Sequence, residues 1–303
     1  MPYIQTLCGL CKDLGCEYKL NEPLKNHTTF KIGGQAKMLV QINSEKSLAE
    51  LVKYLRSNNI KFFVLGKGSN ILASDSGFDG VILKISKDFS KIKLTGENEI
   101  YCTAGTLLSE LCLFALEHSL SGLEFAYGIP GTAGGALFMN AGAYGGEIKD
   151  IIISARFIDK NGEIQTIENQ DMKLSYRHSI FSENSENIIV DMTFSLKTGE
   201  KNEIKAQMDE LLKKRKDKQP LEYPSAGSTF KRPEGSFASL LIDQCGLKGL
   251  TVGNAQVSEK HCGFVINKGG ATFDDVIKLT DEVKKIVFEK TGYQLELEPI
   301  ILK

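Results

Sequence analysis

The sequence contains no apolar run approaching the roughly 20 residues that a membrane-spanning helix needs. Its N-terminus, MPYIQTLCGLCKDLGCEYKL, has no basic segment followed by an apolar core, as a secretory signal would. Neither sign of charge is in excess, because 37 Lys and Arg residues stand against 38 Asp and Glu residues. The net charge of −1 gives no field that would attract nucleic acid or an anionic membrane. We therefore expect a cytoplasmic protein that binds a small molecule.

The sequence also lacks the repeated cysteine pairs of a disulfide framework or a zinc site. Its seven cysteines are an odd set, mostly inside apolar stretches: Cys8, Cys11, Cys16, Cys102, Cys112, Cys245 and Cys262. Buried free thiols in a reducing compartment explain such a set. Cys8 and Cys11 form a CxxC pair without a second pair, inside an amphipathic helical pattern, so a zinc or redox role is only an alternative. We predict no metal site.

The order of elements predicts an α+β fold, because strands and helices do not alternate regularly. A chain of 303 residues, 42% hydrophobic and 25% charged, is long enough for two or three globular domains. Apolar periodicity predicts an N-terminal helix and helices at residues 47–58, 106–119, 170–174, 202–218, 236–245 and 272–290. Strands are expected at residues 39–42, 62–66, 80–85, 91–94, 99–105, on both sides of the turn 160–162, and at 188–196, 255–257, 264–266 and 293–302.

Glycine is concentrated in one segment. Eight of the 29 glycines lie between Gly122 and Gly146, and no charged side chain occurs there from Phe125 onward. Glycine lets a ligand approach the backbone, and successive N–H groups can bind an anion. Tight turns or a disordered loop would also be rich in glycine, but the interleaved apolar and aromatic residues favour an ordered loop. We expect this segment to bind a phosphate-bearing ligand.

A second glycine turn, Gly66-Lys67-Gly68-Ser69-Asn70, follows the expected strand at 62–66. By itself it is a weak motif, since it lacks the third glycine of a dinucleotide fingerprint and the Lys-Ser/Thr ending of a triphosphate loop. Together with the long glycine segment, it offers a second phosphate cradle about sixty residues earlier. Two cradles favour a dinucleotide whose pyrophosphate lies between two lobes.

Four further features bear on chemistry, each with a plainer alternative. Ser228 lies in the string SAGSTFK, which is either a linking turn or a loop that presents a nucleophile or proton donor. Arg177 is either a surface residue or a ligand for a carboxylate. Glu296 and Glu298 share one face of the expected last strand, or mark a charged edge. The basic run 213–218 is either a solvated helix end or a phosphate clamp.

These strings together make the chain resemble the UDP-N-acetylenolpyruvoylglucosamine reductases of peptidoglycan precursor synthesis, in their type two branch. The resemblance runs from about residue 26 to residue 298 and rests on TTFKIGGQA, GKGSNI, GLEFAYGIPGTAGGALFMNAGAYGGEI, SYRHSIF, YPSAGSTFKRP and VSEKHCGF. It implies a two-lobe FAD-binding domain, of the PCMH or vanillyl-alcohol-oxidase type, followed by a smaller α+β substrate-binding domain. The expected boundaries are an N-terminal helical extension at 1–20, lobe 1 at 21–86, lobe 2 at 87–200 and the substrate domain at 201–303.

The resemblance also implies roles for individual residues. Arg177 and Glu298 would stabilise an enolate-like species, and Ser228 would donate the proton. Non-covalent FAD would be bound by Gly66, Lys67, Gly68, Ser69, Asn70, Ile71, Gly128, Gly131, Thr132, Gly134, Gly135, Asn140, Ala141 and Ile189. A nucleotide-sugar substrate would be bound by Tyr176, Arg215, Lys216, Arg232 and His261. NADPH would be the co-substrate, and we expect a monomer with no nucleic-acid partner.

Two rival functions remain open from the residues alone. Flavin oxidases share the two-lobe fold but often carry the flavin on histidine or cysteine, and none of the four histidines lies in either glycine cradle. A non-catalytic nucleotide-binding module would keep the cradles but not Arg177, Ser228 and Glu298. Three positions depart from the family pattern: Lys67, Arg232, and Pro299, which removes a backbone donor beside Glu298.

Overall fold

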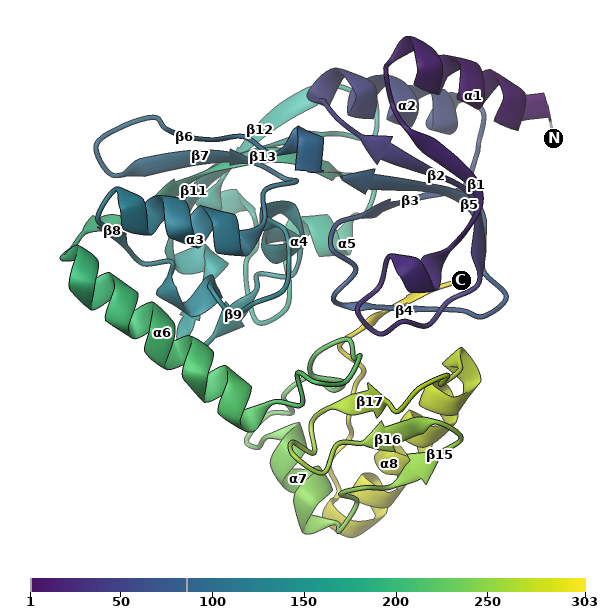
Figure 1. The fold of residues 1–303 in the computed structure, drawn as a ribbon, viewed down its shortest axis with the longest axis vertical. Coiled ribbons are helices and arrows are strands. Elements are labelled where there is room, and N and C mark those ends of the chain that lie inside the picture. Colours follow the sequence, from purple (N-terminus) through teal and green to yellow (C-terminus); the bar gives the residue numbers. More distant parts are fainter. Residues whose placement is uncertain (1, 86) are drawn as a thin grey trace. The chain divides into compact units, whose positions relative to one another are not determined.

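The computed structural model describes residues 2–85 and 87–303 (Figure 1). The chain divides into two compact units, each assembled from separate segments. The larger unit contains residues 2–19, Met38–Gly66 and Gly80–Lys214 without residue 86, and the smaller unit contains Leu20–Lys37, Lys67–Asp79 and Arg215–Lys303. The domain boundaries given above stay a prediction.

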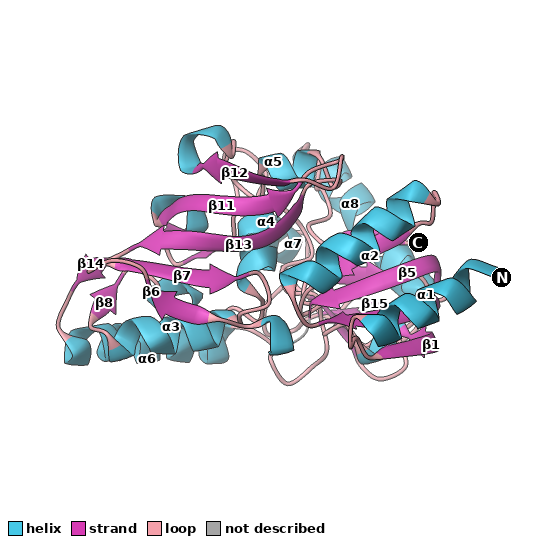
Figure 2. Cartoon of the chain, turned by 90° about the horizontal axis from the view of Figure 1, so that it is seen from above, coloured by secondary structure: helices cyan, strands magenta, loops and turns pink. Residues whose placement is uncertain are grey.

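A five-stranded antiparallel sheet forms the centre of the larger unit (Figure 2). Its strands, in spatial order, are β12 (Ile164–Glu168), β11 (Ile152–Ile158), β13 (Ile188–Ser195), β7 (Glu99–Thr103) and β6 (Ile92–Leu94). The apolar faces of α3 (Leu108–Glu117) and α4 (Ala133–Phe138) share one buried cluster with this sheet, which includes Leu111, Leu137 and Phe194. The hairpin between β11 and β12 turns at Gly162, whose φ of 87° suits glycine, as the sequence predicted.

The second sheet has the order β1-β2-β5-β3, and three of its strands pass from one unit into the other. The strands are β1 (Tyr18–Pro23), β2 (Gln35–Ile42), β5 (Phe78–Ile85) and β3 (Phe62–Leu65), with β3 parallel to β5. Two amphipathic helices, α1 (Pro2–Asp13) and α2 (Glu45–Ser57), bury Leu7, Leu48 and Leu51 in one cluster with the inward residues of β2 and β5. The predicted N-terminal helix is confirmed, and the predicted helix at 47–58 begins two residues earlier.

The smaller unit combines a three-stranded antiparallel sheet with two helices. The sheet contains β15 (Thr251–Val252), β16 (Ala255–Val257) and β17 (Val265–Asn267), and the helices are α7 (Ala238–Gln244) and α8 (Phe273–Thr291). Thr272 caps α8 by accepting the N–H of Asp275 at 3.0 Å, and Gly292, with φ of 76°, ends it, as predicted. The helix buries Val276, among others, in the core of this unit. The last strand, β18 (Ile300–Leu302), pairs in parallel with β4 (Ile71–Ala73).

Two predicted elements are wrong. The strand expected at 293–302 is limited to β18, with one isolated bridge between Phe230 and Leu297, because Pro299 has no N–H to continue a ladder. The helix expected at 170–174 is only a 3-10 turn, Asn169–Asp171, and Lys173 ends it with φ of 52°. The predicted strand at 264–266 is shifted by one residue.

One long helix, α6 (Lys201–Lys218), is largely exposed. The remaining elements are short: α5 (Ile180–Glu183), the strands β8 (Leu120–Ser121), β9 (Gly142–Ala143), β10 (Gly146–Glu147) and β14 (Lys197–Thr198), and 3-10 turns at Leu24–Asn26, Lys87–Phe89, Glu124–Ala126 and Ile148–Asp150. None of the helices in the described part of the chain is long and apolar enough to cross a membrane. The mixture of sheets and helices confirms the α+β class.

Candidate functional site

The turn after β3 is shaped by a close approach of two backbone segments. Gly68 has φ of +71°, and a Cβ at this position would lie 2.1 Å from the carbonyl oxygen of His27, so glycine is required. The N–H of Thr29 donates to the Gly68 carbonyl at 3.1 Å and fixes the turn. Within residues 2–85 and 87–303, the N–H groups of Gly68, Ser69 and Asn70 have no acceptor. Three successive donors are therefore available to an anion.

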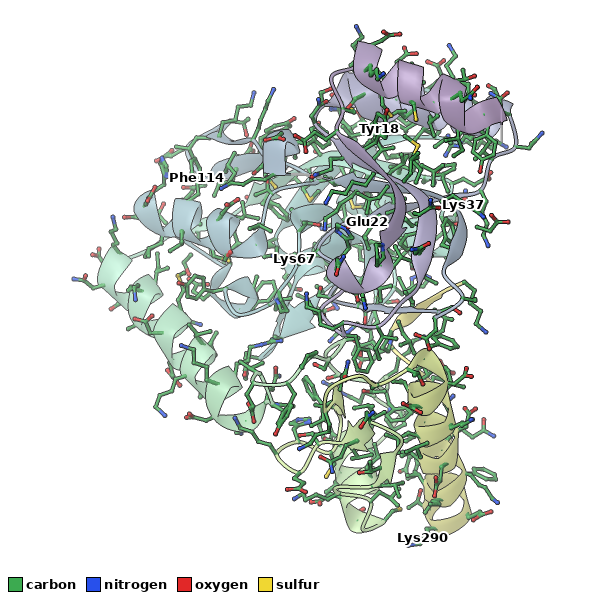
Figure 3. The ribbon with its side chains drawn as sticks, turned by 45° about the vertical axis from the view of Figure 1, so that its right-hand side comes forward. Tyr18, Glu22, Lys37, Lys67, Phe114 and Lys290 are labelled. Atoms are coloured by element: carbon green, nitrogen blue, oxygen red, sulfur yellow. The ribbon has the colours of Figure 1, made fainter. Side chains whose placement is uncertain are left out.

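Lys67 and Ile71 flank this turn. The Lys67 side chain is exposed (Figure 3), and Ile71 is buried as the first residue of β4. Ile71 therefore contributes to packing. The exposed Lys67 side chain can contact a ligand.

The carboxylate residue Glu298 is attached to the same turn. The Asn70 side-chain amide donates to the Glu298 carbonyl at 3.2 Å, and the N–H of Ile300 donates to the Asn70 carbonyl at 2.9 Å. On its other side, the N–H of Glu298 donates to the carbonyl of Thr229 at 3.0 Å. The backbone of Glu298 is thus held from both sides although Pro299 follows it.

Ser228 precedes Thr229, so the structure brings the serine, Glu298 and the glycine turn together in the smaller unit. Gly227, with φ of 79°, turns the chain before Ser228, and Thr229 fixes it by donating to the carbonyl of Gly263 at 2.8 Å. The Ser228 side chain is half-buried, and its hydroxyl has no hydrogen-bond partner among the described residues. Its proton is therefore available to a ligand.

His261 lies in the same part of the smaller unit, since its loop includes Gly263. Its Nδ1 accepts the N–H of Gly263 at 3.1 Å, and burial lowers the pKa of the imidazole. The ring is therefore neutral at pH 7, with its proton on Nε2.

The glycines in and around the long segment are constrained in different ways within the larger unit. A Cβ at Gly66 would lie 2.7 Å from Thr132 Oγ1, so the end of the first cradle touches the second. Thr132 caps α4 by accepting the N–H of Gly135 at 3.3 Å. Gly134 is required for packing, because its Cβ would lie 2.7 Å from the Cβ of Ala104, and its N–H is used by the Ala104 carbonyl.

Several amide groups of this segment are left for a ligand, and two of them belong to Gly128 and Gly131. The N–H groups of Gly128 and Gly131 donate to no acceptor in the part of the chain that the structure describes. By contrast, the N–H of Ala141 is bonded to the carbonyl of Ala136, and Ile189 lies in the core on β13 with 7% of its surface exposed. Only some of the predicted cofactor-binding residues therefore have an unbonded backbone N–H that a ligand could use.

The side chain of Asn140 is used entirely inside the larger unit. It is fully buried, its Nδ2 donates to Glu147 Oε2 at 2.7 Å and to the Ser175 carbonyl at 2.9 Å, and its Oδ1 accepts the N–H of Lys149 at 2.9 Å. Contact between Asn140 and a cofactor is therefore limited to its backbone.

Arg177 is presented by a two-residue turn. Ser175 and His178 exchange two backbone hydrogen bonds, of 3.2 and 3.1 Å, and leave Tyr176 and Arg177 at the tip. Arg177 has φ of +55°, an uncommon value for a residue with a side chain. Its Nη2 donates to the carbonyl of Gly142 at 3.3 Å, and its guanidinium lies 5.0 Å from the centre of the Tyr176 ring. The arginine is thus held against the glycine segment.

The other predicted substrate residues are less constrained. Arg215 and Lys216 lie in the last turn of α6, where Lys260 Nζ donates to the Lys216 carbonyl at 2.8 Å. Arg232 is exposed, with its guanidinium 5.0 Å from the centre of the Phe237 ring. Arg215, Lys216 and Lys260 therefore bring three basic side chains to the C-terminal end of α6, where the helix dipole favours cations.

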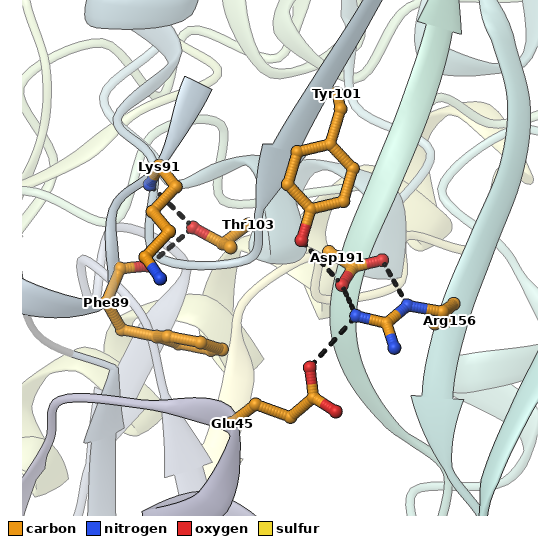
Figure 4. Close-up of polar contacts among 7 residues, drawn as sticks. All are labelled: Glu45, Phe89, Lys91, Tyr101, Thr103, Arg156 and Asp191. Carbon is orange, nitrogen blue, oxygen red and sulfur yellow. Dashed lines mark hydrogen bonds and ion pairs between the residues drawn. The ribbon is translucent and has the colours of Figure 1, made fainter. Parts of the chain in front are cut away.

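An ion pair between the buried Asp191 and the half-buried Arg156, which the sequence did not reveal, stabilises the larger unit (Figure 4). Asp191, which is 2% exposed, accepts hydrogen bonds from the Tyr101 hydroxyl at 2.9 Å and from Arg156 Nε at 3.1 Å. Arg156 Nη2 also reaches Glu45 at 2.9 Å. Burial, together with the bond to Asp191, raises the pKa of Tyr101 to about 12. This network connects three strands of the sheet to the start of α2.

A cavity of about 710 Å³ lies in the smaller unit, away from these residues. Its wall includes Lys25, Lys31 and Lys268, which are exposed, and Asn267, which is buried and bonded to three backbone groups. None of the predicted site residues lines it. We do not assign it to the candidate site.

Comparisons with known proteins agree with these features. Residues 219–302 match the family model described as UDP-N-acetylenolpyruvoylglucosamine reductase, C-terminal domain, and residues 36–168 match an FAD binding domain. The chain is 50% identical over 276 residues to the UDP-N-acetylenolpyruvoylglucosamine reductase of Caldanaerobacter subterraneus, covering 91% of this chain and 90% of the relative. It is 44% identical to that of Clostridioides difficile, covering 99% and 97%.

A solved structure extends the similarity to the fold. The crystal structure of UDP-N-acetylenolpyruvylglucosamine reductase from Thermus caldophilus matches with a TM-score of 0.80 and 34% identity, covering 95% of this chain and 99% of that one. The family resemblance and the FAD-binding fold expected from the sequence are confirmed.

Proposed function

The chain belongs to the UDP-N-acetylenolpyruvoylglucosamine reductase family, and we propose that it reduces UDP-N-acetylenolpyruvoylglucosamine to UDP-N-acetylmuramate with FAD and NADPH. This reaction is a step of peptidoglycan precursor synthesis. Identity of 50% over nine-tenths of both chains supports the proposal, since the match includes the FAD-binding and the C-terminal segments.

The residues present fit FAD. Gly68, Ser69 and Asn70 offer three unbonded N–H groups in a turn that a Cβ would close, and Gly128 and Gly131 offer two more. We propose that these amides bind the pyrophosphate, since backbone donors suit a phosphate group. Neither turn contains a histidine or cysteine to carry the flavin covalently. When bound, FAD supplies the two-electron chemistry, taking electrons from NADPH and passing them to the vinyl carbon.

We propose that three side chains control the charge that develops on the substrate. Reduction of the enolpyruvyl double bond moves negative charge toward its carboxylate, and the Arg177 guanidinium compensates that charge. A carboxyl at Glu298 beside this anion is driven toward its neutral, donating form. Ser228 donates the proton to the carbon beside the carboxylate. The observation that carries this assignment is the position of Ser228: its hydroxyl has no hydrogen-bond partner among the described residues, and it directly precedes Thr229, whose carbonyl accepts the Glu298 N–H.

The remaining assignments concern the residues that bind the nucleotide sugar, the domains, the oligomeric state and the cellular compartment. Arg215 and Lys216 bind the UDP diphosphate, and Tyr176, Arg232 and His261 contact the rest of the nucleotide sugar. The proposed domains are those predicted from the sequence, and the proposed state is a monomer. All seven cysteines are free, which supports the cytoplasm as the compartment.

Steady-state turnover tests the proposal and separates it from its rivals. The purified, FAD-loaded protein should oxidise NADPH beyond one equivalent per flavin only when the enolpyruvyl nucleotide is added, with one product molecule per NADPH turned over. UDP-N-acetylglucosamine, which lacks the double bond, is the control and should give no oxidation. Rapid NADPH oxidation at the expense of oxygen without the nucleotide would indicate an oxidase. FAD binding without any turnover would indicate a binding module, and both results contradict the proposal.

A further inference from the structure

The turn that carries Arg177 is attached at both ends to the glycine segment. At its start, the Ser175 carbonyl accepts the Nδ2 of Asn140 at 2.9 Å. At its end, the Ser179 hydroxyl donates to the Phe138 carbonyl at 2.7 Å. Phe138 and Asn140 both lie at the end of α4, within the segment that contains the Gly128 and Gly131 amides. The position of the turn is therefore set by the end of this helix.

Asn140 is suited to fixing the turn because both polar atoms of its side chain, Nδ2 and Oδ1, are hydrogen-bonded within the larger unit. Both hydrogens on Nδ2 are used, by Ser175 and by Glu147, and Oδ1 accepts the N–H of Lys149. The residue is fully buried, where an unmade hydrogen bond is costly. Its φ of +40° is tolerated better by asparagine than by most residues. One side chain thus joins three backbone segments.

We propose that Asn140 is a positioning residue that holds the Arg177 turn against the glycine segment, and that it contributes no side-chain contact to the cofactor. The inference rests on the proposed function, in which Arg177 compensates charge on the substrate. Since a shift of about 1 Å in a positioned group can lower a rate a hundredfold, a loosened turn affects the substrate step. A loosened turn leaves FAD binding and the reduction of the flavin by NADPH unchanged.

Asn140→Asp is the most specific perturbation. The aspartate keeps an acceptor for Lys149 and tolerates positive φ, but an oxygen replaces the Nδ2 donor and faces Glu147 Oε2 and the Ser175 carbonyl. Asn140→Gly removes both Nδ2 bonds and the bond from Lys149 without adding charge, and provides a second variant. Asn169→Asp is the matched control, because Asn169 Nδ2 likewise makes two hydrogen bonds, to the carbonyls of Lys149 and Ile152 at 3.0 and 2.9 Å, and neither acceptor belongs to the turn.

Native-state digestion with trypsin measures the turn without reference to activity. Cleavage after Arg177, quantified by mass spectrometry, should accelerate about tenfold or more in both Asn140 variants, since each lost hydrogen bond is worth roughly a factor of five. Cleavage after Arg156, in strand β11 between β12 and β13, is the internal measure of global unfolding and should not change. Unchanged cleavage after Arg177, or equal acceleration at both sites, would overturn the proposal.

Rapid kinetics then tests the effect on the reaction. In Asn140→Asp, reoxidation of the flavin by the nucleotide should slow by about ten- to a hundredfold, with reduction by NADPH and the FAD dissociation constant unchanged. The double variant with Arg177→Lys should be no slower than Arg177→Lys alone, because both changes act through the same group. Weaker FAD binding with an intact turn would contradict the proposal. If Arg177→Lys itself had no effect, the proposed role of Arg177 would fail, while the digestion would still decide the anchoring.

Discussion

Replacing Gly68 by alanine should weaken FAD binding, because the new Cβ would lie 2.1 Å from the His27 carbonyl oxygen and 3.1 Å from the Cα of Thr28. These are backbone atoms, so no side chain can move aside. The left-handed backbone, with φ of +71°, costs alanine about 1–2 kcal/mol, and relief of the clash costs about 1–3 kcal/mol. Together they amount to about 2–5 kcal/mol. The turn must move away from His27, which displaces the three N–H donors.

Gly246→Ala is the matched control in the same unit. Its φ of +74° is nearly the same, but nothing lies within 4 Å of the added Cβ, so only the backbone cost applies. FAD titration of the apoprotein should give a dissociation constant at least about tenfold higher for Gly68→Ala and unchanged for Gly246→Ala. Urea unfolding should show the larger stability loss for Gly68→Ala. Wild-type FAD affinity in Gly68→Ala would refute the assignment of this turn to the cofactor.

Three further predictions concern the acid, the histidine and the last helix. Ser228→Ala should slow flavin reoxidation by the nucleotide by roughly two to four powers of ten and leave reduction by NADPH nearly intact, as stopped-flow absorbance would show. Equal loss in both steps would point to misfolding. Burial lowers the pKa of His261, so the unfolded chain takes up a proton at a higher pH than the folded chain does. The unfolding free energy should therefore fall as the pH drops below about 6.5, and His261→Gln should reduce that slope; an unchanged slope would contradict the burial argument. Thr272→Ala removes the cap on the Asp275 N–H and should cost about 1 kcal/mol in urea unfolding. A loss of unfolding free energy below a few tenths of a kcal/mol would mean that another group replaces the cap.

Local signals predicted those elements whose stability is local. Helix α8 has its cap, Thr272, and its stop, Gly292, in the sequence next to it, and both were identified. The hairpin at Gly162 was predicted for the same reason. The last strand was predicted too long because alternating leucines suggest a strand, whereas Pro299 limits it to β18. The partner of β18 is β4, more than two hundred residues earlier. Pairing over that distance leaves no pattern in the sequence.

In the candidate site, too, local features were predicted from the sequence and features that depend on the folded chain were not. Glycine spacing predicted the turn at Gly68, since its conformation restricts the residue that can occupy it. Glycine spacing did not separate Gly134, which is needed for packing, from Gly131, whose N–H is unbonded. Nor could it show that the Asn140 side chain turns inward, because hydrogen bonds to Ser175 and Glu147 depend on the folded backbone. The ion pair between Arg156 and the buried Asp191 was missed because, in sequence, both are ordinary charges.

The central claim is that this chain uses FAD to reduce an enolpyruvyl nucleotide, and anaerobic single-turnover spectroscopy tests it most directly. The purified protein should show the visible absorption of oxidised flavin, and stoichiometric NADPH should bleach it. Subsequent addition of UDP-N-acetylenolpyruvoylglucosamine should restore the absorption and yield one UDP-N-acetylmuramate per flavin. A colourless protein that does not take up FAD, or a bleached flavin that the nucleotide cannot reoxidise, would contradict the claim.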